Sequence, residues 1–363
     1  MKNLCSIFVL LFALSFVSQA QNSSFNAEKA NALFKAKVDN NQMVGVAAGI
    51  YKEGKVIWQK SAGYRNRENQ KPATVDMLNR TASISKPMTA IAILQLYEQK
   101  KLGLDDPIQK YLPYFPEKKR GTITIRHLLH HISGIGAYRK RSEAYSTKNY
   151  PTLKDAIGVF QGRKLLSKPG KEYHYTTYGY VVLGAIIEKA SGMAYRDYMK
   201  KNIWDKAGMT HTDVEIFGKS YENKSKLYRK NRKGKVVTDK NTDLSVKMPG
   251  GGIQSTVGDL LKFGEAVLNH QLIKPETFKM MTQHPGIKKR GNPYGMGWFI
   301  YGRDSDPTGM VIGHSGSQSG TSTQLLIYVK KKIVVAALCN TAGVWPDIID
   351  LTARLGRAAS GSY

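Results

Sequence analysis

Ser83 and Lys86 have the residue types and the spacing of a nucleophile and its base, in the only Ser-x-x-Lys sequence of the chain. A serine hydroxyl is a poor nucleophile until a base takes its proton. At positions i and i+3 of a helical turn, the hydroxyl and the amine share one face. A buried lysine can be that base, because desolvation disfavours its ammonium form and lowers its pKa. The spacing therefore predicts a lysine-assisted nucleophile, although a capping serine followed by a surface lysine is the more common structure behind it.

Two further short sequences carry groups that suit such a site. Tyr175-Thr176-Thr177 directly precedes a predicted helix, and a tyrosine near two cationic groups can have a lowered pKa and act as a general base. His314-Ser315-Gly316, followed by Ser317, lies on a predicted strand. An edge strand can pair with an extended substrate, and its N–H groups can face a carbonyl oxygen. Each sequence alone is a weak signal, since most tyrosines are packing residues and glycine-serine runs usually mark turns.

The elements that must position these residues are split along the chain. Residues 44–63 predict two strands joined by a tight turn at Glu53-Gly54. Residues 87–100 predict a helix, and its section Met88–Leu94 is apolar on almost every face, as in a buried helix. Further helices are predicted at 153–161, 179–191, 257–269 and about 344–358, and further strands at 297–302, 308–313, 321–329 and 333–339. Strands at both ends with helices between them predict one sheet built from both termini, with a helical insertion.

The 363 residues include 55 Lys and Arg against 27 Asp and Glu, a formal charge of +28. Nine Lys or Arg and two acidic residues lie between Gly218 and Asn241, and Lys118–Arg120, Arg139–Arg141 and Lys288–Arg290 add three basic triplets. Such charge attracts anions, although a solvated surface without a partner is the more common interpretation. No nucleic-acid-binding signature accompanies the charge, so we expect no nucleic acid and at most a weak contact with anionic cell-wall polymers.

The N-terminus has the pattern of a secretory signal. Lys2 precedes an apolar run from Leu4 to Val17, and Ser18-Gln19-Ala20 offers small residues for cleavage after Ala20. About 14 apolar residues are too few to cross a bilayer, so we expect no transmembrane anchor. Once Cys5 is removed with the signal, Cys339 remains alone and no internal disulfide can form. The sequence therefore predicts an exported protein, secreted or periplasmic.

His127, His130 and His131 have spacings that could place two imidazoles on one helical face, as in a metal site. No cysteine or carboxylate follows them at the spacing of a metal motif. We therefore expect no metal and no cofactor.

Taken in order, the three sequences and their surroundings resemble the serine β-lactamase-like family. This family includes class C β-lactamases, D-Ala-D-Ala carboxypeptidases of the penicillin-binding type, related esterases and D-aminopeptidases. The supporting stretches are ASISKPMTA (82–90), ITIRHLLHHISGI (123–135), YGYVVLGAIIEKASG (178–192), GGGIQSTVGDLLKFG (250–264) and GHSGSQSG (313–320). The resemblance covers roughly residues 30–345 and is nearest to the mitochondrial serine β-lactamase-like branch of animals.

The resemblance implies an α/β (α+β) fold: an antiparallel sheet from both chain ends with flanking helices, plus a mostly helical inserted subdomain. After a signal peptide at 1–20, the sheet part would comprise about 27–80 and 285–363 and the helical subdomain about 81–284 of one catalytic domain (21–363). The site would lie in the cleft between the two parts.

The resemblance also assigns roles by position. Ser83 would be the acylated nucleophile, Lys86 its proton-transfer partner and Tyr175 the general base or acid. The backbone N–H groups of Ser83 and Ser317 would form the oxyanion hole. The residues expected to bind substrate or the oxyanion are Ser83, Thr177, His314, Ser315, Gly316 and Ser317.

Two departures from the family bear on the substrate. Thr177 stands where β-lactamases have Asn, and offers only a hydroxyl. His314 replaces the strand lysine, a permanent cation for a substrate carboxylate, and we expect its charge to depend on pH near about 6.5. Both changes favour a peptidase, amidase or esterase over an efficient β-lactamase.

We therefore predict an exported serine hydrolase that acts through an acyl-enzyme on Ser83. It would cleave amide or ester bonds in small substrates, with D-Ala-D-Ala-type or other cell-wall peptides as the expected class. A class C-like β-lactamase or an esterase is the first alternative. A non-catalytic, penicillin-binding-like sensor of wall fragments is the second, and an anion-binding surface protein is the third.

Overall fold

The computed structural model describes residues 25–38, 43–287, 294–302 and 309–361. The predicted signal peptide (1–20) and the basic triplet at 288–290 lie outside these residues. Within the described residues, no helix combines the length and the apolar character that a membrane span requires.

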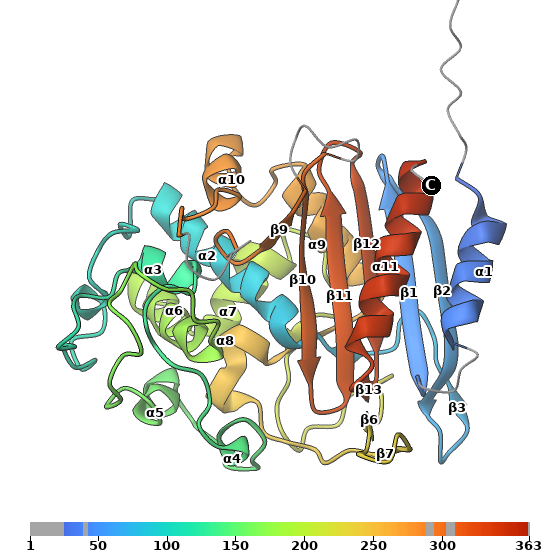
Figure 1. Ribbon diagram of the computed structural model, residues 1–363, viewed down its shortest axis with the longest axis horizontal. Coiled ribbons are helices and arrows are strands. Elements are labelled where there is room, and N and C mark those ends of the chain that lie inside the picture. The colour runs from blue at the N-terminus through green and yellow to red at the C-terminus, as the bar shows by residue number, and fades with distance from the viewer. Residues whose placement is uncertain (1–24, 39–42, 288–293, 303–308, 362–363) are drawn as a thin grey trace, which may run out of the picture.

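A seven-stranded antiparallel sheet forms the largest layer of the molecule, with the strand order β3-β2-β1-β12-β11-β10-β9. Its strands are β1 (Gly45–Lys52), β2 (Lys55–Asn66), β3 (Lys71–Pro72), β9 (Phe299–Tyr301), β10 (Val311–Gln318), β11 (Thr321–Tyr328) and β12 (Ile333–Cys339). β1 pairs with β12, so the two ends of the chain meet at the middle of the sheet (Figure 1). The prediction of one antiparallel sheet built from both termini is confirmed.

The strand predictions hold in most of their detail. Glu53 and Gly54 form the tight turn between β1 and β2, with φ of 48° and 90°. β10 extends to Gln318, beyond the predicted run 308–313, and it includes His314, Ser315 and Gly316, which the sequence also placed on a strand. That extension follows from pairing along its whole length with β11, which supplies the hydrogen bonds that a turn would have had to find locally.

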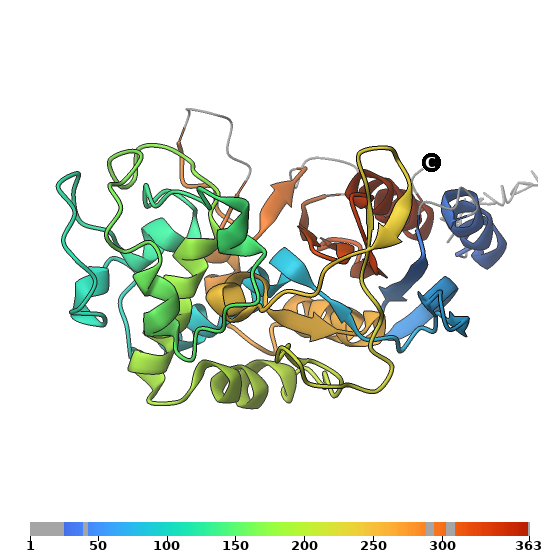
Figure 2. The same ribbon diagram turned by 90° about the horizontal axis from the view of Figure 1, so that it is seen from below.

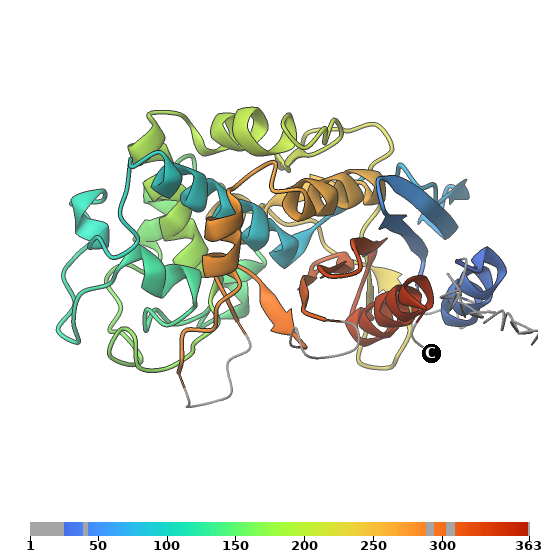
Figure 3. The same cartoon turned by 90° about the horizontal axis from the view of Figure 1, so that it is seen from above.

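Helices cover both faces of this sheet. Ile333, Val335 and Ala337 of β12 belong to the core with α1 (Ala27–Val38) and α11 (Trp345–Ser360). Val334 and Ala336 point the opposite way and belong to the core with α9 (Val257–Leu268). This alternation is the two-residue period of a strand buried on both sides. Figures 2 and 3 show α9 and α11 on opposite faces of the sheet. α9 thus packs on the sheet, although its residues fall in the range expected for the helical subdomain.

The remaining helices gather beside the sheet around α2 (Ser85–Glu98) (Figures 1 and 2). All residues of α2 from Ser85 to Leu96 are buried, which confirms the predicted buried helix. Its neighbours α6 (Thr177–Ser191) and α8 (Met248–Gly251) pack directly on it. The other helices are α3 (Ile125–Leu129), α4 (Arg141–Ala144), α5 (Leu153–Gly158), α7 (Tyr195–Met199) and α10 (Pro275–Met281).

Short elements connect the two parts. A 3₁₀ turn, η1 (Ala82–Ile84), leads into α2, and other single turns are η2 (Ile108–Lys110), η3 (Lys200–Trp204) and η4 (Ser245–Lys247). Two small sheets have the strand orders β4-β8-β5 and β13-β6-β7. Their strands are β4 (Asn79–Arg80), β5 (Asp213–Val214), β6 (Tyr228–Lys230), β7 (Val236–Thr238), β8 (Ile253–Ser255) and β13 (Thr341–Ala342).

Candidate active site

Ser83 lies in the η1 turn, where the chain leaves β4 and enters α2. The preceding residue, Ala82, has φ of 48°, a left-handed conformation that costs energy for a residue with a Cβ atom. The flanking backbone is fixed on both sides. The Thr81 N–H donates to the Ile253 carbonyl at 2.9 Å, and the Thr323 hydroxyl donates to the Thr81 carbonyl at 3.0 Å. The strained turn is therefore held by two neighbouring strands, and it leaves Ser83 partly exposed.

Lys86, in the first turn of α2, contacts Ser83 in the η1 turn that precedes it. Its Nζ atom lies 3.0 Å from Ser83 Oγ, 2.8 Å from the Gly250 carbonyl oxygen and 3.3 Å from Thr177 Oγ1. The side chain is fully buried. Burial, and then the charge of nearby Lys247, hold the pKa of Lys86 well below its usual value. A neutral amine can donate its two N–H groups to Gly250 and Thr177 while its lone pair faces the Ser83 hydroxyl.

Tyr175 approaches the same hydroxyl from the start of α6. The Lys86 Nζ atom lies 4.8 Å from the centre of its ring, and the nearby Ser83 hydroxyl favours its ionised form. Burial nevertheless raises the pKa of Tyr175 well above its usual value. The expectation of a lowered pKa is wrong, because desolvation of a phenolate outweighs the opposing influence of the Ser83 hydroxyl. Tyr175 therefore keeps its proton, and is suited to pass a proton on and regain it.

Thr177 and Gly250 complete the surroundings of the lysine. Thr177 is the first residue of α6, and its hydroxyl lies beside Lys86. Thr176 caps this helix, because its hydroxyl accepts a hydrogen bond from the Tyr178 N–H at 3.2 Å. A Cβ atom on Gly250 would lie 2.6 Å from Thr177 Cγ2. Glycine at this position lets α8 come close enough for its carbonyl to bind Lys86.

Ser315, Gly316 and Ser317 lie on the part of β10 that extends beyond its pairing with β9, which ends at Gly313. This part of β10 contacts the η1 turn. The contact is close at Gly316, where an added Cβ atom would lie 2.5 Å from the Thr81 carbonyl oxygen. Ser317, the next residue, has an exposed side chain. The structure thus brings this strand edge and the Ser83 turn together.

His314, in contrast, points into the protein and is only 1% exposed. Its Nε2 atom lies 3.0 Å from the Tyr294 hydroxyl, and its Nδ1 atom lies 2.6 Å from the Ser315 carbonyl oxygen. Burial and the neighbouring Lys86 lower the pKa of His314 to about 3. The expectation of a charge that changes near pH 6.5 is therefore wrong. His314 is neutral at physiological pH and offers a substrate no cation.

Sequence reasoning missed three residues around this site. Tyr294 supports His314, but a lone tyrosine 20 positions upstream has no distinctive spacing. Lys247 has the sequence context of a surface lysine, yet it is 4% exposed and its Nζ donates to the Ala144 carbonyl at 2.8 Å. Burial lowers the pKa of Lys247 to about 7. Arg80 binds Glu215 in a buried ion pair and donates to the Ser319 carbonyl at 3.1 Å, which ties β4 to the end of β10.

The histidines considered for a metal have other surroundings. His131 is buried and stacks among aromatic rings, with its ring centre 4.3 Å from that of Tyr175. His130 lies 3.4 Å from the Tyr294 carbonyl oxygen through its Nδ1 atom. Within the described residues, no group of three or more potential ligands is arranged to hold a metal ion.

The antiparallel sheet joined to a helical part is a fold that this chain shares with solved structures of penicillin-binding proteins and their homologues. The model of the Beta-lactamase family matches residues 30–359, nearly the whole chain. The protein therefore belongs to this family, as its sequence predicted.

Individual relatives agree with this assignment. The human "Serine beta-lactamase-like protein LACTB, mitochondrial" is 29% identical, over 83% of this chain and 74% of its own. An octameric penicillin-binding protein homologue from Pyrococcus abyssi is 27% identical with a TM-score of 0.81, covering 93% of this chain and 78% of its own. A D-stereospecific amidohydrolase from a Streptomyces species is 25% identical with a TM-score of 0.77, covering 90% and 98%.

Proposed function

We propose that this protein is a serine hydrolase that cleaves amide or ester bonds through an acyl-enzyme on Ser83. The observation that carries the proposal is the 3.0 Å contact between Ser83 Oγ and the buried Nζ atom of Lys86. An amine whose pKa is depressed by burial is a base poised to take the proton of a hydroxyl. The family assignment supports the same reaction class.

In the proposed reaction, Ser83 Oγ attacks the substrate carbonyl carbon while its proton passes to Lys86. The backbone N–H groups of Ser83 and Ser317 stabilise the negative charge that develops on the carbonyl oxygen. Tyr175 gives its proton to the leaving amine or alcohol as the old bond breaks, and regains a proton from the Lys86 ammonium. Water then attacks the ester, its proton passes to the same pair, and Ser83 Oγ leaves with a proton restored.

The proposed substrates are small amides, peptides or esters rather than β-lactams, with D-Ala-D-Ala-type peptides as the leading class. A neutral, buried His314 supplies no cation for a substrate carboxylate, which disfavours efficient β-lactam hydrolysis. The Streptomyces neighbour is named a D-stereospecific amidohydrolase, which supports an amide substrate of D-configuration.

A turnover panel on the purified protein tests this proposal. It compares nitrocefin, p-nitrophenyl esters, and D-Ala-D-Ala and D-amino-acid peptides. We expect turnover of an amide or ester by the wild type, none by Ser83→Ala, and unchanged turnover by Ser220→Ala, an exposed serine away from the site. Equal turnover by Ser83→Ala and wild type would contradict the proposal. Acylation of Ser83 with no turnover of any substrate would instead indicate a penicillin-binding-like sensor.

We propose further that the protein is exported and cleaved after Ala20. The support is the basic, apolar and small-residue pattern of residues 1–20. Cell fractionation with mass spectrometry of the N-terminal peptide tests it. A mature N-terminus at Gln21 in the exported fraction is expected, and an intact N-terminus found only in the cytosol would contradict it.

A further inference from the structure

A large basic cavity adjoins the end of β10 that carries Ser317. Its main part has a volume of about 970 Å³, and a second part of about 310 Å³ shares six of its lining residues, Arg141 and Arg232 among them. The second part is also lined by Ser317 and Gln318. The cavity is therefore continuous with the strand edge beside the Ser83 turn.

The charged residues that line this cavity are mostly cations. Its basic lining residues are Arg141, Arg229, Lys230, Arg232, Lys233 and Lys240. Asp239 is the one acidic residue among those that line the two described parts. Its carboxylate is already engaged, because it accepts from the Ser319 hydroxyl and the Gly320 N–H at 3.0 Å each and lies 3.3 Å from Arg229. One carboxylate, that of Asp239, therefore leaves most of the positive charge of the six basic residues unbalanced.

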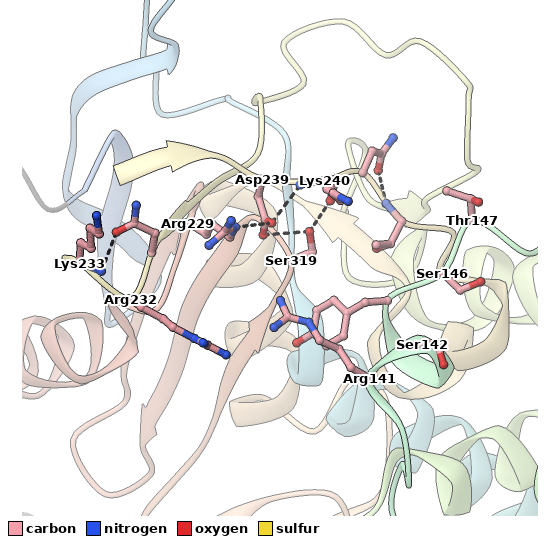
Figure 4. A pocket seen from close by; sticks show the side chains of 14 residues that line it. Arg141, Ser142, Ser146, Thr147, Arg229, Arg232, Lys233, Asp239, Lys240 and Ser319 are labelled. Carbon is pink, nitrogen blue, oxygen red and sulfur yellow. Dashed lines mark hydrogen bonds and ion pairs between the residues drawn. The ribbon is translucent and has the colours of Figure 1, made fainter. Parts of the chain in front are cut away.

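Arg141 and Arg232 approach the cavity from separate elements. Arg141 begins α4, Arg232 lies in the turn between β6 and β7, and their side chains extend towards one another (Figure 4). Both residues are exposed. In the described parts of the chain, neither has a carboxylate within ion-pair distance. A guanidinium presents a planar fork of N–H groups that matches a carboxylate or a phosphate.

A hollow lined by cations focuses positive potential and concentrates anions within it. Scattered surface lysines and arginines, each surrounded by water, would do so much less. The cavity also begins where an extended substrate would leave the Ser83 turn along β10 towards Ser319. These two properties, shape and position, distinguish this charge from the basic surface elsewhere on the molecule.

We propose that this cavity binds an anionic portion of the substrate, which carries two or more carboxylate or phosphate groups on the side of the scissile bond nearest Ser319. The inference rests on the proposed acyl transfer at Ser83, and it adds a substrate class to that reaction. Anionic charge at this end of β10 is compatible with a neutral His314 in the middle of the strand.

A binding measurement tests the cavity independently of catalysis. In a Ser83→Ala background, calorimetry would follow N-acetyl-triglutamate amide in one arm and tripolyphosphate in the other. Arg141→Gln/Arg232→Gln removes two cations of the cavity. Lys201→Gln/Lys206→Gln removes two exposed cations outside it, and so matches the change in net charge.

We expect about tenfold weaker binding in the cavity variant, unchanged binding in the control, and loss of affinity at high salt. If the cavity variant loses affinity for N-acetyl-triglutamate amide, the preferred group is a carboxylate, and if it loses affinity for tripolyphosphate, the preferred group is a phosphate. Equal affinity in the two variants, or no binding of either anion, would overturn the inference.

A second measurement connects the cavity to the reaction. The first pair of substrates is the p-nitrophenyl esters of N-acetyl-Glu-Glu-Gly and N-acetyl-Gln-Gln-Gly, which carry the Glu or Gln residues on the acyl side of the scissile bond. The second pair consists of esters that carry the Glu or Gln residues on the leaving group instead. In one of the two pairs, we expect the wild type to hydrolyse the Glu ester with a higher kcat/KM than the matching Gln ester. In the cavity variant, this ratio of kcat/KM values should fall by about tenfold, mainly because KM for the Glu ester rises. Hydrolysis of all four esters without any preference would overturn the inference and leave the proposed function intact. No hydrolysis at all would contradict the proposed function, and the binding measurement would then decide on the cavity.

Discussion

The Nζ atom of Lys86 lies 3.0 Å from Ser83 Oγ at a place where the lysine is fully buried. Because an ammonium is costly to bury, this position biases Lys86 towards the neutral amine that a general base must be. The contacts of Lys86 with Gly250 and Thr177 fix its amine beside the hydroxyl. Burial and hydrogen bonding together thus prepare Ser83 for proton transfer.

Replacing this base should abolish turnover without loss of the fold. Lys86→Met keeps the length of the side chain and removes the amine, and we expect kcat/KM to fall by about 10² to 10⁴-fold. Lys86→Arg should be equally inactive, because a guanidinium does not give up its proton. Steady-state kinetics with an ester, together with circular dichroism, would check both variants. Substantial activity in Lys86→Arg would rule out Lys86 as the base.

Lys247 should tune the pH dependence of the reaction. Its charge helps to lower the pKa of Lys86, so activity should rise with pH as Lys86 loses its proton. Lys247→Met removes that repulsion, and the pKa of Lys86 should rise. The acid limb of the kcat/KM profile should therefore move to higher pH.

The exposed Lys201→Met variant is the control, and its acid limb should stay in place. A limb that does not move in Lys247→Met, or that moves to lower pH, would contradict this coupling.

The same substitution has a consequence for stability. Burial lowers the pKa of Lys247 to about 7 in the folded protein, below the unfolded value, so the folded state binds this proton less well. The resulting cost is fully present below about pH 7 and disappears as pH rises towards the unfolded pKa. Lys247→Met should therefore raise the free energy of unfolding most at low pH. Urea titrations across this pH range would measure the difference in free energy of unfolding between Lys247→Met and the wild type. This difference should narrow as pH rises, and a constant difference would refute the lowered pKa of Lys247.

Tyr175→Phe should separate substrates by their leaving groups. The variant keeps the ring beside Lys86 and removes the phenolic proton. An amide needs its leaving nitrogen protonated and should lose about 10² to 10³-fold in kcat, while a p-nitrophenyl ester should lose much less. Tyr173→Phe, two residues upstream, is the matched control. An equal loss for amide and ester would argue against a proton relay through Tyr175.

Gly316 should tolerate no side chain, because β10 approaches the Ser83 turn too closely there. A Cβ atom would lie 2.3 Å from Thr323 Oγ1 and 2.5 Å from the Thr81 carbonyl oxygen. Gly316→Ala should destabilise the fold by about 1–3 kcal/mol and reduce acylation at least about tenfold. Gly158→Ala on α5, where a Cβ would meet nothing within 4 Å, should change neither. Thermal unfolding and ester kinetics would measure both, and a fully active Gly316→Ala would contradict the close contact.

The fold was predictable where the apolar pattern was regular. The run Met88–Leu94 indicated the buried helix α2, and the apolar run 333–339 indicated the strand β12. The end of β10 was less predictable, because its glycines and serines have low strand propensity alone. Pairing with β11 holds that segment in an extended conformation, and the local sequence does not show which strand it will pair with.

The candidate site was predictable in its residue types but not in its electrostatics. Burial raises the pKa of Tyr175, whereas the neighbouring cations led us to expect a lowered pKa. Burial also lowers the pKa of His314, whereas we expected the ordinary pKa of a histidine. Lys247 could not be recognised because burial of a lysine depends on the packing of α4 and η4 around it. Desolvation is a property of the assembled core, so a short sequence around each residue does not contain it.

Intact-mass measurement after reaction with a fluorophosphonate probe is the most direct test of the central claim that Ser83 becomes acylated. We predict one adduct on the wild-type protein, located on Ser83 by peptide mapping, much slower labelling of Lys86→Met and none of Ser83→Ala. An unmodified wild type, or equal labelling of Ser83→Ala, would contradict the account.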